Sequence, residues 1–278
     1  MKNIIISNQA NFEKKLKAFK KAGAKVLHIV SDFDRTLTKV FVNGKKQPTS
    51  FAQIREGRYL SQEYVRKSYE LRDKYYPIEQ DPNYPINKKK KMMDEWWIKH
   101  LNLMVECGMN YGVIRDILNK NRIKAREGAP QFLRLLAKKK IPFLIFSAGL
   151  GDIIKGYLKK KNLLSDNIHL ISNFYKFDKK GKVTGYRSKI VHSFNKNEIE
   201  IRDTKYYEEI KKRKNILLMA DHIGDLDMTE GLKHDNIIRI CFLNENIKTL
   251  IREYKKHFDV IILNDGPMDF VNDIITKI

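Results

Sequence analysis

The residues with the clearest potential for chemistry are two aspartates, Asp32 and Asp34, which directly follow the apolar run 26–30 and are separated by one residue. At the end of a strand, both carboxylates can face one concave site as the chain turns into a loop. Such close like charges are costly unless a cation neutralises them, and a hard cation such as Mg²⁺ prefers oxygen ligands. Because Asp-x-Asp also occurs in ordinary acidic turns, the pair indicates a metal site only together with further motifs.

A second motif combines small residues with a hydroxyl group. Ser147, Ala148 and Gly149 follow the apolar run 142–146 and precede a segment with helical spacing. Backbone N–H groups at the start of a helix, beside a hydroxyl group, can bind an anion such as phosphate. A helix cap with tight packing would explain the same residues equally well.

Two more aspartates, Asp221 and Asp225, follow the apolar run 216–219, again just past the end of a predicted strand. Lys196 lies between this motif and the serine motif in the sequence. A lysine near an acidic cluster can hold a phosphate group as a point charge. Taken alone, Lys196 is one of many lysines and carries almost no signal.

The elements that would position these residues are six apolar runs, each followed by a segment with helical spacing. Near-continuous apolar strands that alternate with helices are typical of a parallel sheet covered on both faces. In such sheets ligands bind in the crevice at the carboxyl ends of the strands, where the aspartate and serine motifs are predicted to lie. The sequence therefore predicts an α/β fold with a Rossmann-like parallel sheet. The runs cover residues 26–30, 142–146, 169–172, 216–219, 237–242 and 260–263.

Between the first two runs lies a segment of different character, residues 49–126, which is rich in helix formers and aromatic residues and has no strand-like run. We expect Pro77, Pro82 and Pro85 to break it into helical pieces. The segment is predicted to be a helical cap domain, inserted after the first strand, that covers the crevice and determines substrate specificity. Residues 1–48 and 127–278 are expected to form the α/β core domain, which includes a hairpin at 177–183.

Composition limits the classes of function. Of the 278 residues, 42% are hydrophobic, and 55 Lys+Arg against 33 Asp+Glu give a formal net charge of +22. Because the lysines form short clusters along the whole chain, we interpret them as solvated surface and regard nucleic acid as a side possibility. No apolar stretch approaches the roughly 20 residues of a membrane span, the N-terminus lacks the pattern of a secretory signal, and two isolated cysteines exclude a disulfide framework. These features predict a soluble cytoplasmic protein without a membrane partner.

The order of the motifs is more specific than any one of them. Asp-x-Asp-x-Thr after the first run, a serine after the second, an intervening lysine and Asp-x-x-x-Asp after a later run resemble the haloacid dehalogenase-like phosphohydrolases. Longer stretches narrow the resemblance: DFDRTLT, KYYPIEQDP, FLIFSAGLGD, IVHSFNKNE and ADHIGDLDMTEG. With them, the chain from Phe12 to Ile278 is similar to the cytosolic type III 5′-nucleotidases, also called pyrimidine 5′-nucleotidases.

This resemblance implies an enzyme that uses Mg²⁺ to hydrolyse nucleoside 5′-monophosphates, with CMP and UMP favoured and 7-methyl-GMP as a variant. Asp32 is then the nucleophile that forms an aspartyl-phosphate intermediate. Asp34 is the acid that protonates the ribose 5′ oxygen, and then the base that deprotonates water. Mg²⁺ is expected to bind the Asp32 carboxylate, the Asp34 backbone carbonyl and Asp221. Asp225 is expected to orient Lys196 or a metal-bound water.

The resemblance also assigns residues that hold the phosphate group. Ser147 and the Ala148 N–H are expected to bind its oxygens, and Lys196 to offset the charge that builds on it. Lys196 is preferred over Lys189 for this role because it lies within the Phe-Asn-Lys match. Thr36 is expected either to contact the phosphate or to cap the loop.

In the predicted cap, the resemblance assigns Glu79 to nucleoside binding, and His100 stands where the family usually has a serine that contacts the nucleotide. Trp96 and Trp97 are candidates for stacking on the base. Adjacent residues of one helix cannot both face the pocket, so at least one indole is expected to be core.

Two departures from the family pattern lie beside the presumed metal site. His222 and Ala220 stand where the family has a serine and a glycine. His222 is expected to be an exposed structural residue, although its position next to a presumed metal ligand leaves a change in the metal's surroundings open.

Two rival functions stay open at this point. The chain could be a phosphatase of another small metabolite, such as phosphoserine, or a non-catalytic polyanion-binding protein that kept the scaffold. Phosphoryl transfer to a second nucleoside is also open, since any hydroxyl group could intercept the intermediate. We expect a monomer that binds a nucleoside monophosphate and has no obligate protein partner.

Overall fold

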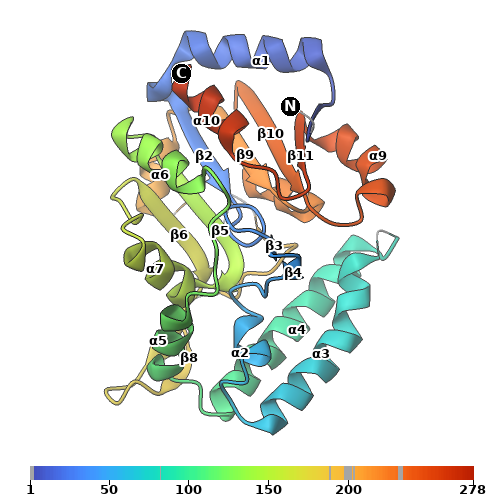
Figure 1. The fold of residues 1–278 in the computed structure, drawn as a ribbon, viewed down its shortest axis with the longest axis vertical. Helices are drawn as coiled ribbons and strands as arrows, with labels where there is room; N and C mark the ends of the chain where they lie inside the picture. The colour runs from blue at the N-terminus through green and yellow to red at the C-terminus, as the bar shows by residue number, and fades with distance from the viewer. Residues whose placement is uncertain (1–2, 82, 188, 197–201, 203, 231–233) are drawn as a thin grey trace.

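The computed structural model describes residues 3–81, 83–187, 189–196, 202, 204–230 and 234–278. They form a central sheet with helices on both faces and a helical insertion beside it (Figure 1). The strands are β1 (Ile4–Ile6), β2 (Leu27–Ser31), β3 (Phe41–Val42), β4 (Lys45–Lys46), β5 (Phe143–Leu150), β6 (Ile168–Asn173), β7 (Tyr175–Phe177), β8 (Val183–Tyr186), β9 (Asn215–Ala220), β10 (Asn236–Leu243) and β11 (Val260–Leu263). The helices are α1 (Gln9–Ala22), α2 (Gln53–Glu56), α3 (Gln62–Gln80), α4 (Ile86–Glu106), α5 (Tyr111–Lys120), α6 (Ala129–Lys138), α7 (Gly151–Lys160), α8 (Lys205–Ile210), α9 (Ile247–His257) and α10 (Asp269–Thr276), with short 3₁₀ segments η1 (Ala24–Val26) and η3 (Ile223–Thr229).

The seven strands of the main sheet follow the order β1-β11-β10-β9-β2-β5-β6. All neighbours are parallel except β1, which pairs antiparallel with β11. The six predicted apolar runs all form strands of this sheet, which confirms the predicted α/β class. The edge strand β1 was not predicted, because a three-residue strand is too short to show a period. The helical insertion therefore follows β2, which is the second strand of the main sheet along the chain, and comes after the short hairpin β3–β4.

Alternate residues of each strand face opposite layers, which explains why the runs are apolar throughout. Leu27 and Ile29 of β2 pack in the cluster that includes Phe12 and Phe19 of α1, together with apolar residues of α6, α7 and α10. Val30 faces the other side, where α8 packs, and α9 covers β10 and β11 on that same side. Each fully buried aliphatic or aromatic side chain contributes roughly 1.5–3 kcal/mol, so the two layers hold the strand ends rigidly in place.

Helices α3 and α4 form an antiparallel pair that projects away from the sheet (Figure 1). The expectation that Pro77 breaks the segment is wrong: α3 continues through Pro77 to Gln80, and the N–H of the C-cap residue Asp81 donates to the Pro77 carbonyl. Pro85 does precede a helix as the N-cap of α4, and Pro82 lies outside the described residues. With 19 and 21 residues these are the longest described helices, and none of the helices described is long and apolar enough to cross a membrane.

The end of the predicted cap packs on the core. Helix α5 contacts α7, and Asn110 just before it forms a β-bridge with Lys182 of the predicted hairpin, which exists as β7 and β8. The bounds 49–126 of a separate cap domain therefore stay a prediction, and α2, α3 and α4 are the helices that lie beside the cavity described below.

Candidate active site

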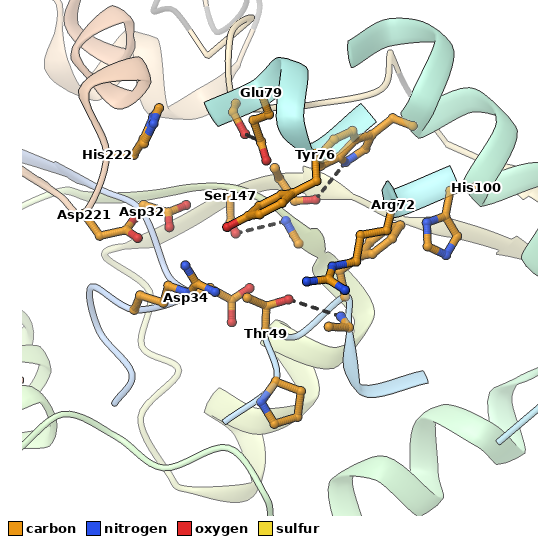
Figure 2. A pocket seen from close by; sticks show the side chains of 18 of the residues that line it. Asp32, Asp34, Thr49, Arg72, Tyr76, Glu79, His100, Ser147, Asp221 and His222 are labelled. Atoms are coloured by element: carbon orange, nitrogen blue, oxygen red, sulfur yellow. Dashed lines mark hydrogen bonds between the residues drawn. The ribbon is translucent and has the colours of Figure 1, made fainter. Parts of the chain in front are cut away.

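The carboxyl ends of β2, β5 and β9 bring the predicted motifs to one place. Ser31, the last residue of β2, is paired with Met219 of β9 on one side and Ile145 of β5 on the other. The chain continues from β2 to β5 on one side of the sheet and reaches β9 on the other, so this is the switch point at which such sheets form a crevice. A cavity of about 540 Å³ lies there, between these strand ends and the helical insertion (Figure 2).

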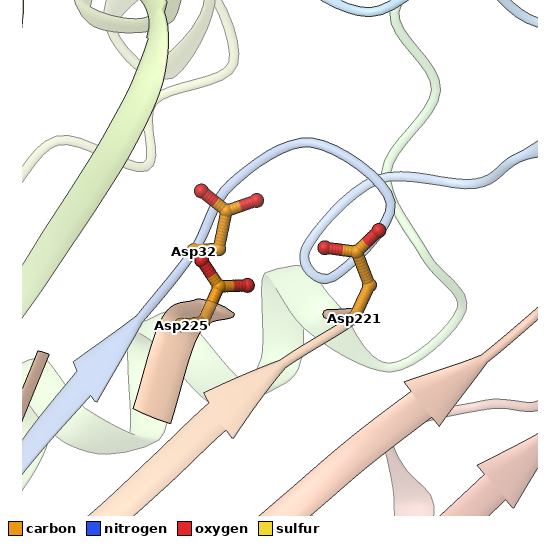
Figure 3. A group of neighbouring side chains, drawn as sticks. All are labelled: Asp32, Asp221 and Asp225. Atoms are coloured by element: carbon orange, nitrogen blue, oxygen red, sulfur yellow. The ribbon is translucent and has the colours of Figure 1, made fainter. Parts of the chain in front are cut away.

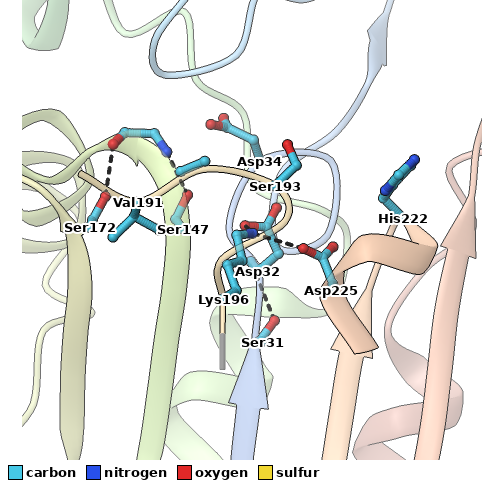
Figure 4. A network of polar contacts seen from close by, with 12 residues as sticks. Ser31, Asp32, Asp34, Ser147, Ser172, Val191, Ser193, Lys196, His222 and Asp225 are labelled. Atoms are coloured by element: carbon cyan, nitrogen blue, oxygen red, sulfur yellow. Dashed lines mark hydrogen bonds and ion pairs between the residues drawn. The ribbon is translucent and has the colours of Figure 1, made fainter. Parts of the chain in front are cut away.

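Lys196 is the centre of the polar network at the base of the cavity (Figure 4). Its Nζ donates to Asp32 Oδ1 at 2.6 Å and to Asp225 Oδ1 at 2.8 Å, and the residue is only 3% exposed. Burial by itself would lower the pKa of Lys196, but the Asp225 and Asp32 carboxylates raise it above its usual value. Burial raises the pKa of Asp32, and the charge of Lys196 opposes part of this increase. The lysine is therefore a fixed positive charge beside the predicted nucleophile.

Asp32, Asp221 and Asp225 form a cluster whose carboxylate oxygens lie within 4.8 Å of one another (Figure 3). Burial raises the pKa of Asp221 well above its usual value, and the neighbouring Asp225 and Asp32 carboxylates raise it further. Lys196 contacts two of these three carboxylates, Asp32 and Asp225, so the cluster keeps excess negative charge. A divalent cation held by oxygen ligands would neutralise it.

The donor set therefore fits the predicted Mg²⁺. It differs from the prediction in one respect, because Asp225 offers an oxygen to the same cluster as well as holding Lys196. The Asp34 backbone carbonyl stays a predicted ligand.

Asp34 is held by Ser50, a residue that the sequence analysis did not single out. The Ser50 N–H donates to Asp34 Oδ1 at 2.8 Å, and the Ser50 hydroxyl donates to Asp34 Oδ2 at 2.6 Å. Burial raises the pKa of Asp34, and these two hydrogen bonds oppose the increase. Ser50 is fully buried and lies where the chain enters the insertion, so no local pattern in the sequence marks it.

Gly149 faces the same pair of residues. A Cβ built on it would lie 2.1 Å from Ser50 Oγ, 3.1 Å from Asp34 Oδ2 and 3.2 Å from Ser147 Oγ. Only glycine leaves room for this arrangement. The run of small residues at 147–149 is the sequence feature that could have indicated this need for glycine at position 149.

Ser147 and Ala148 line the cavity, but not at a helix N-terminus as predicted. Strand β5 continues to Leu150, with an irregular register after Phe146, and α7 begins only at Gly151. The Ser147 hydroxyl accepts a hydrogen bond from the Gly149 N–H at 3.1 Å. The two residues are thus presented by a distorted strand end, and their phosphate-binding role stays a prediction.

The loop after β2 is held by Arg126, whose importance was not predicted. Its Nε donates to the Thr36 carbonyl at 2.6 Å and its Nη1 to the Gly266 carbonyl at 2.9 Å, while the guanidinium lies 4.2 Å from the centroid of the Phe242 ring. The hydroxyl of Thr36 is buried without a hydrogen-bond partner among the described residues and does not line the cavity, which supports neither role expected for it. Thr38 caps the loop in its place, by accepting from the Arg35 N–H at 2.9 Å.

The residues predicted to recognise the nucleoside lie at the other end of the cavity. Glu79, near the end of α3, accepts a hydrogen bond from the Ser193 hydroxyl at 2.7 Å. His100 of α4 is buried, contacts the Tyr64 hydroxyl at 3.2 Å through Nε2, and packs edge-on against Phe51. Burial lowers the pKa of His100 to about 3, with a smaller contribution from Arg55, so its imidazole is neutral at pH 7.

Both indoles of α4 line the cavity, contrary to the expectation that only one could face it. Trp96 is nevertheless a core residue, stacked on Tyr75 with the ring planes 14° apart. Trp97 is half-buried, lies beside Phe51, and its Nε1 donates to the Ala148 carbonyl at 3.4 Å. Trp97 is thus the more available of the two for stacking on a base.

Three positions named in the sequence analysis remain: His222, Ala220 and Lys189. His222 is half-buried and not exposed as predicted, and it lines the cavity. It also caps η3 by accepting from the Gly224 N–H at 3.0 Å. Ala220 is buried at the end of β9. Lys189 is exposed, whereas Lys196 contacts the aspartate cluster.

Comparisons with known proteins agree with this arrangement. The profile of a family described as pyrimidine 5′-nucleotidase (UMPH-1) matches residues 35–278. The 7-methylguanosine phosphate-specific 5′-nucleotidase A of Xenopus laevis is 35% identical over 262 residues, which cover 94% of this chain and 90% of that protein. The crystal structure of cytosolic 5′-nucleotidase IIIB bound to cytidine has a TM-score of 0.90 at 31% identity and covers 100% of this chain and 94% of that chain. A phospho-aspartyl intermediate analogue of phosphoserine phosphatase, with a TM-score of 0.52 at 16% identity over 90% of this chain and 99% of that chain, is similar in fold alone.

Proposed function

Because the chain belongs to the pyrimidine 5′-nucleotidase (UMPH-1) family and is a 5′-nucleotidase, we propose that it uses Mg²⁺ to hydrolyse CMP, UMP and 7-methyl-GMP through an aspartyl-phosphate on Asp32. The observation that carries this proposal is the contact of buried Lys196 with Asp32 inside the cluster completed by Asp221 and Asp225. The substrate range is inferred from the pyrimidine 5′-nucleotidase family and from two relatives, one specific for 7-methylguanosine phosphate and one bound to cytidine.

The phosphate end of the cavity supports the following steps. Lys196 occupies Asp32 Oδ1, so we assign the attack on phosphorus to Oδ2. The P–O bond to the ribose breaks as Asp34 gives its proton to the 5′ oxygen, and Asp34 then takes a proton from the water that hydrolyses the aspartyl-phosphate. Ser147 and the Ala148 N–H are assigned to the phosphate oxygens. When bound, Mg²⁺ supplies positive charge to the carboxylate cluster and to the phosphate.

The insertion is assigned to the nucleoside. Phe51, Tyr76 and Trp97 give the cavity aromatic surface, and Glu79 gives it a hydrogen-bond acceptor for an amino group of the base. The net charge of +22 favours the approach of a phosphorylated substrate. From the name of the related cytosolic enzyme we also infer a cytosolic protein, and we expect it to act as a monomer.

A panel of monophosphates tests the proposal, with phosphate release measured with Mg²⁺ and with excess chelator. The panel contains CMP, UMP, AMP, GMP, 7-methyl-GMP and phosphoserine. We expect Mg²⁺-dependent release from CMP, UMP and 7-methyl-GMP above that from phosphoserine. Release from phosphoserine alone would favour a different metabolite phosphatase. Absence of any release, together with salt-sensitive binding to RNA, would favour the polyanion-binding alternative.

A further inference from the structure

Ser193 joins the core of the protein to Glu79 in the insertion. Its hydroxyl donates to Glu79 Oε1 at 2.7 Å, and both residues line the cavity. Ser193 lies on the loop that leads to Lys196 (Figure 4), and Glu79 lies in the last turn of α3 (Figure 2). A single hydrogen bond thus connects the loop of the phosphate end with the predicted nucleoside-binding carboxylate.

The surroundings of Glu79 indicate what this hydrogen bond does to its side chain. A negative charge in the last turn of a helix is disfavoured by the helix dipole, and the last turn of α3 contains no basic residue to offset it. The backbone there is held by Lys89, which is 5% exposed and whose Nζ donates to the Glu79 carbonyl at 3.3 Å and to the Asp81 carbonyl. The remaining freedom is that of the Glu79 side chain, which has three torsions, and Ser193 restricts it.

We propose that Ser193 is a specificity-determining residue, which fixes the Glu79 carboxylate so that Oε2 is presented to an amino group of the base. An ionised carboxylate only accepts hydrogen bonds. Held in place, it attracts the 4-amino group of cytosine or the 2-amino group of a 7-methylguanine base and repels the 4-carbonyl oxygen of uracil. Released from Ser193, it can turn away from that oxygen. This inference rests on the proposed function, because it takes Glu79 as the residue that meets the base.

Removal of the Ser193 hydroxyl leaves the rest of the loop anchored. The His192 N–H donates to Asn195 Oδ1 at 2.8 Å, and Asn195 Nδ2 donates to the Ile190 carbonyl at 2.9 Å. His192 Nε2 also contacts Asp94 Oδ1 of α4 at 3.0 Å. Lys196 should therefore stay on Asp32 in the Ser193→Ala variant, which separates an effect on the base from an effect on the phosphate.

The test compares kcat and KM of wild type and Ser193→Ala for CMP, UMP and 7-methyl-GMP, with ribose 5-phosphate as a competitive inhibitor that has no base. We expect kcat/KM for CMP and 7-methyl-GMP to fall about tenfold, mainly through KM, because a hydrogen bond to a charged group is lost. The kcat/KM for UMP should change less, so that the ratio of kcat/KM for CMP to kcat/KM for UMP decreases. The inhibition constant of ribose 5-phosphate should stay unchanged, and Ser193→Thr, which keeps the hydroxyl, should restore most of the CMP value.

Asp94→Ala is the matched control, because it removes another polar side-chain contact between this loop and the insertion without touching Glu79. We expect it to leave the CMP preference unchanged. In a Glu79→Ala background, Ser193→Ala should have no further effect on CMP. Equal weakening of CMP and ribose 5-phosphate, or the same kinetic change in Asp94→Ala, would overturn the assignment and point to loop docking. Failure of the wild type to release phosphate from any nucleotide would instead overturn the proposed function.

Discussion

Replacement of Gly149 by alanine is a direct test of how the structure positions Asp34. The new Cβ would lie 2.1 Å from Ser50 Oγ, about 1.3 Å inside the 3.4 Å at which ordinary contact begins. The Ser50 hydroxyl has to move, and its 2.6 Å hydrogen bond to Asp34 Oδ2 is then lost. A hydrogen bond to a charged group is worth about 1.5–3 kcal/mol, which corresponds to roughly a 10- to 100-fold decrease in kcat if it is needed in the transition state.

Stability should change less than activity. Overpacking of one methyl group costs about 1–3 kcal/mol, against a total stability of about 5–15 kcal/mol for a typical protein, so the variant should remain folded. The assay is kcat for Mg²⁺-dependent phosphate release from CMP, with circular dichroism and Tm measured on the same samples. Gly156→Ala is the matched control, because its Cβ would lie 2.4 Å from Leu118 Cδ1 in α5, at the flexible end of a side chain that does not line the cavity.

Gly149 and Ser50 can also be tested together. In a Ser50→Ala background the closest clash of the added methyl group at position 149 is absent, so the double variant should have nearly the kcat of Ser50→Ala alone. Wild-type kcat in Gly149→Ala would show that the Ser50–Asp34 contact does not support catalysis. A loss of activity as large in Gly156→Ala would show that the effect comes from general destabilisation.

Three further predictions concern the site and the core. Asp32→Asn should abolish phosphate release while Tm stays within a few degrees of wild type, and measurable turnover by a purified sample would contradict the role of Asp32 as nucleophile. Mg²⁺ at about 100 times its dissociation constant should stabilise the protein by about 2.7 kcal/mol, seen as a rise in Tm that Asp221→Asn removes and that chelator reverses. Burial lowers the pKa of His28 to about 3, so the unfolded chain takes up a proton near pH 6.5 that the native protein does not. Unfolding free energy should therefore fall by about 1.4 kcal/mol per pH unit from this group as the pH decreases below 6.5, with a smaller slope in His28→Gln but not in the exposed control His257→Gln in denaturant titrations.

Much of the fold could be predicted because a strand buried on both faces of a parallel sheet is a near-continuous apolar run, which can be recognised in the sequence. Strands such as β2 and β9 are buried at every position and mostly apolar, and they alternate with segments of helical spacing. The prediction for Pro77 is wrong because the packing of α3 against α4 outweighs the tendency of a proline to end a helix. Strand β1 could not be predicted because three residues are too few to show a period.

The sequence by itself determined which polar residues follow the apolar runs: Asp32, Asp221 and Ser147 each do so, and parallel pairing places the ends of these runs at one edge of the sheet. The resemblance favoured Lys196, and the tertiary structure places its Nζ on Asp32. Only the tertiary structure decided that Asp225 joins the carboxylate cluster and that Ser50 holds Asp34. It also decided that Ser193 meets Glu79. The physical reason is the separation of the contacting residues along the chain. Periodicity and strand ends are local properties of the chain, whereas these contacts join residues from 16 to 164 positions apart, and no local pattern records which distant partner a polar side chain will find.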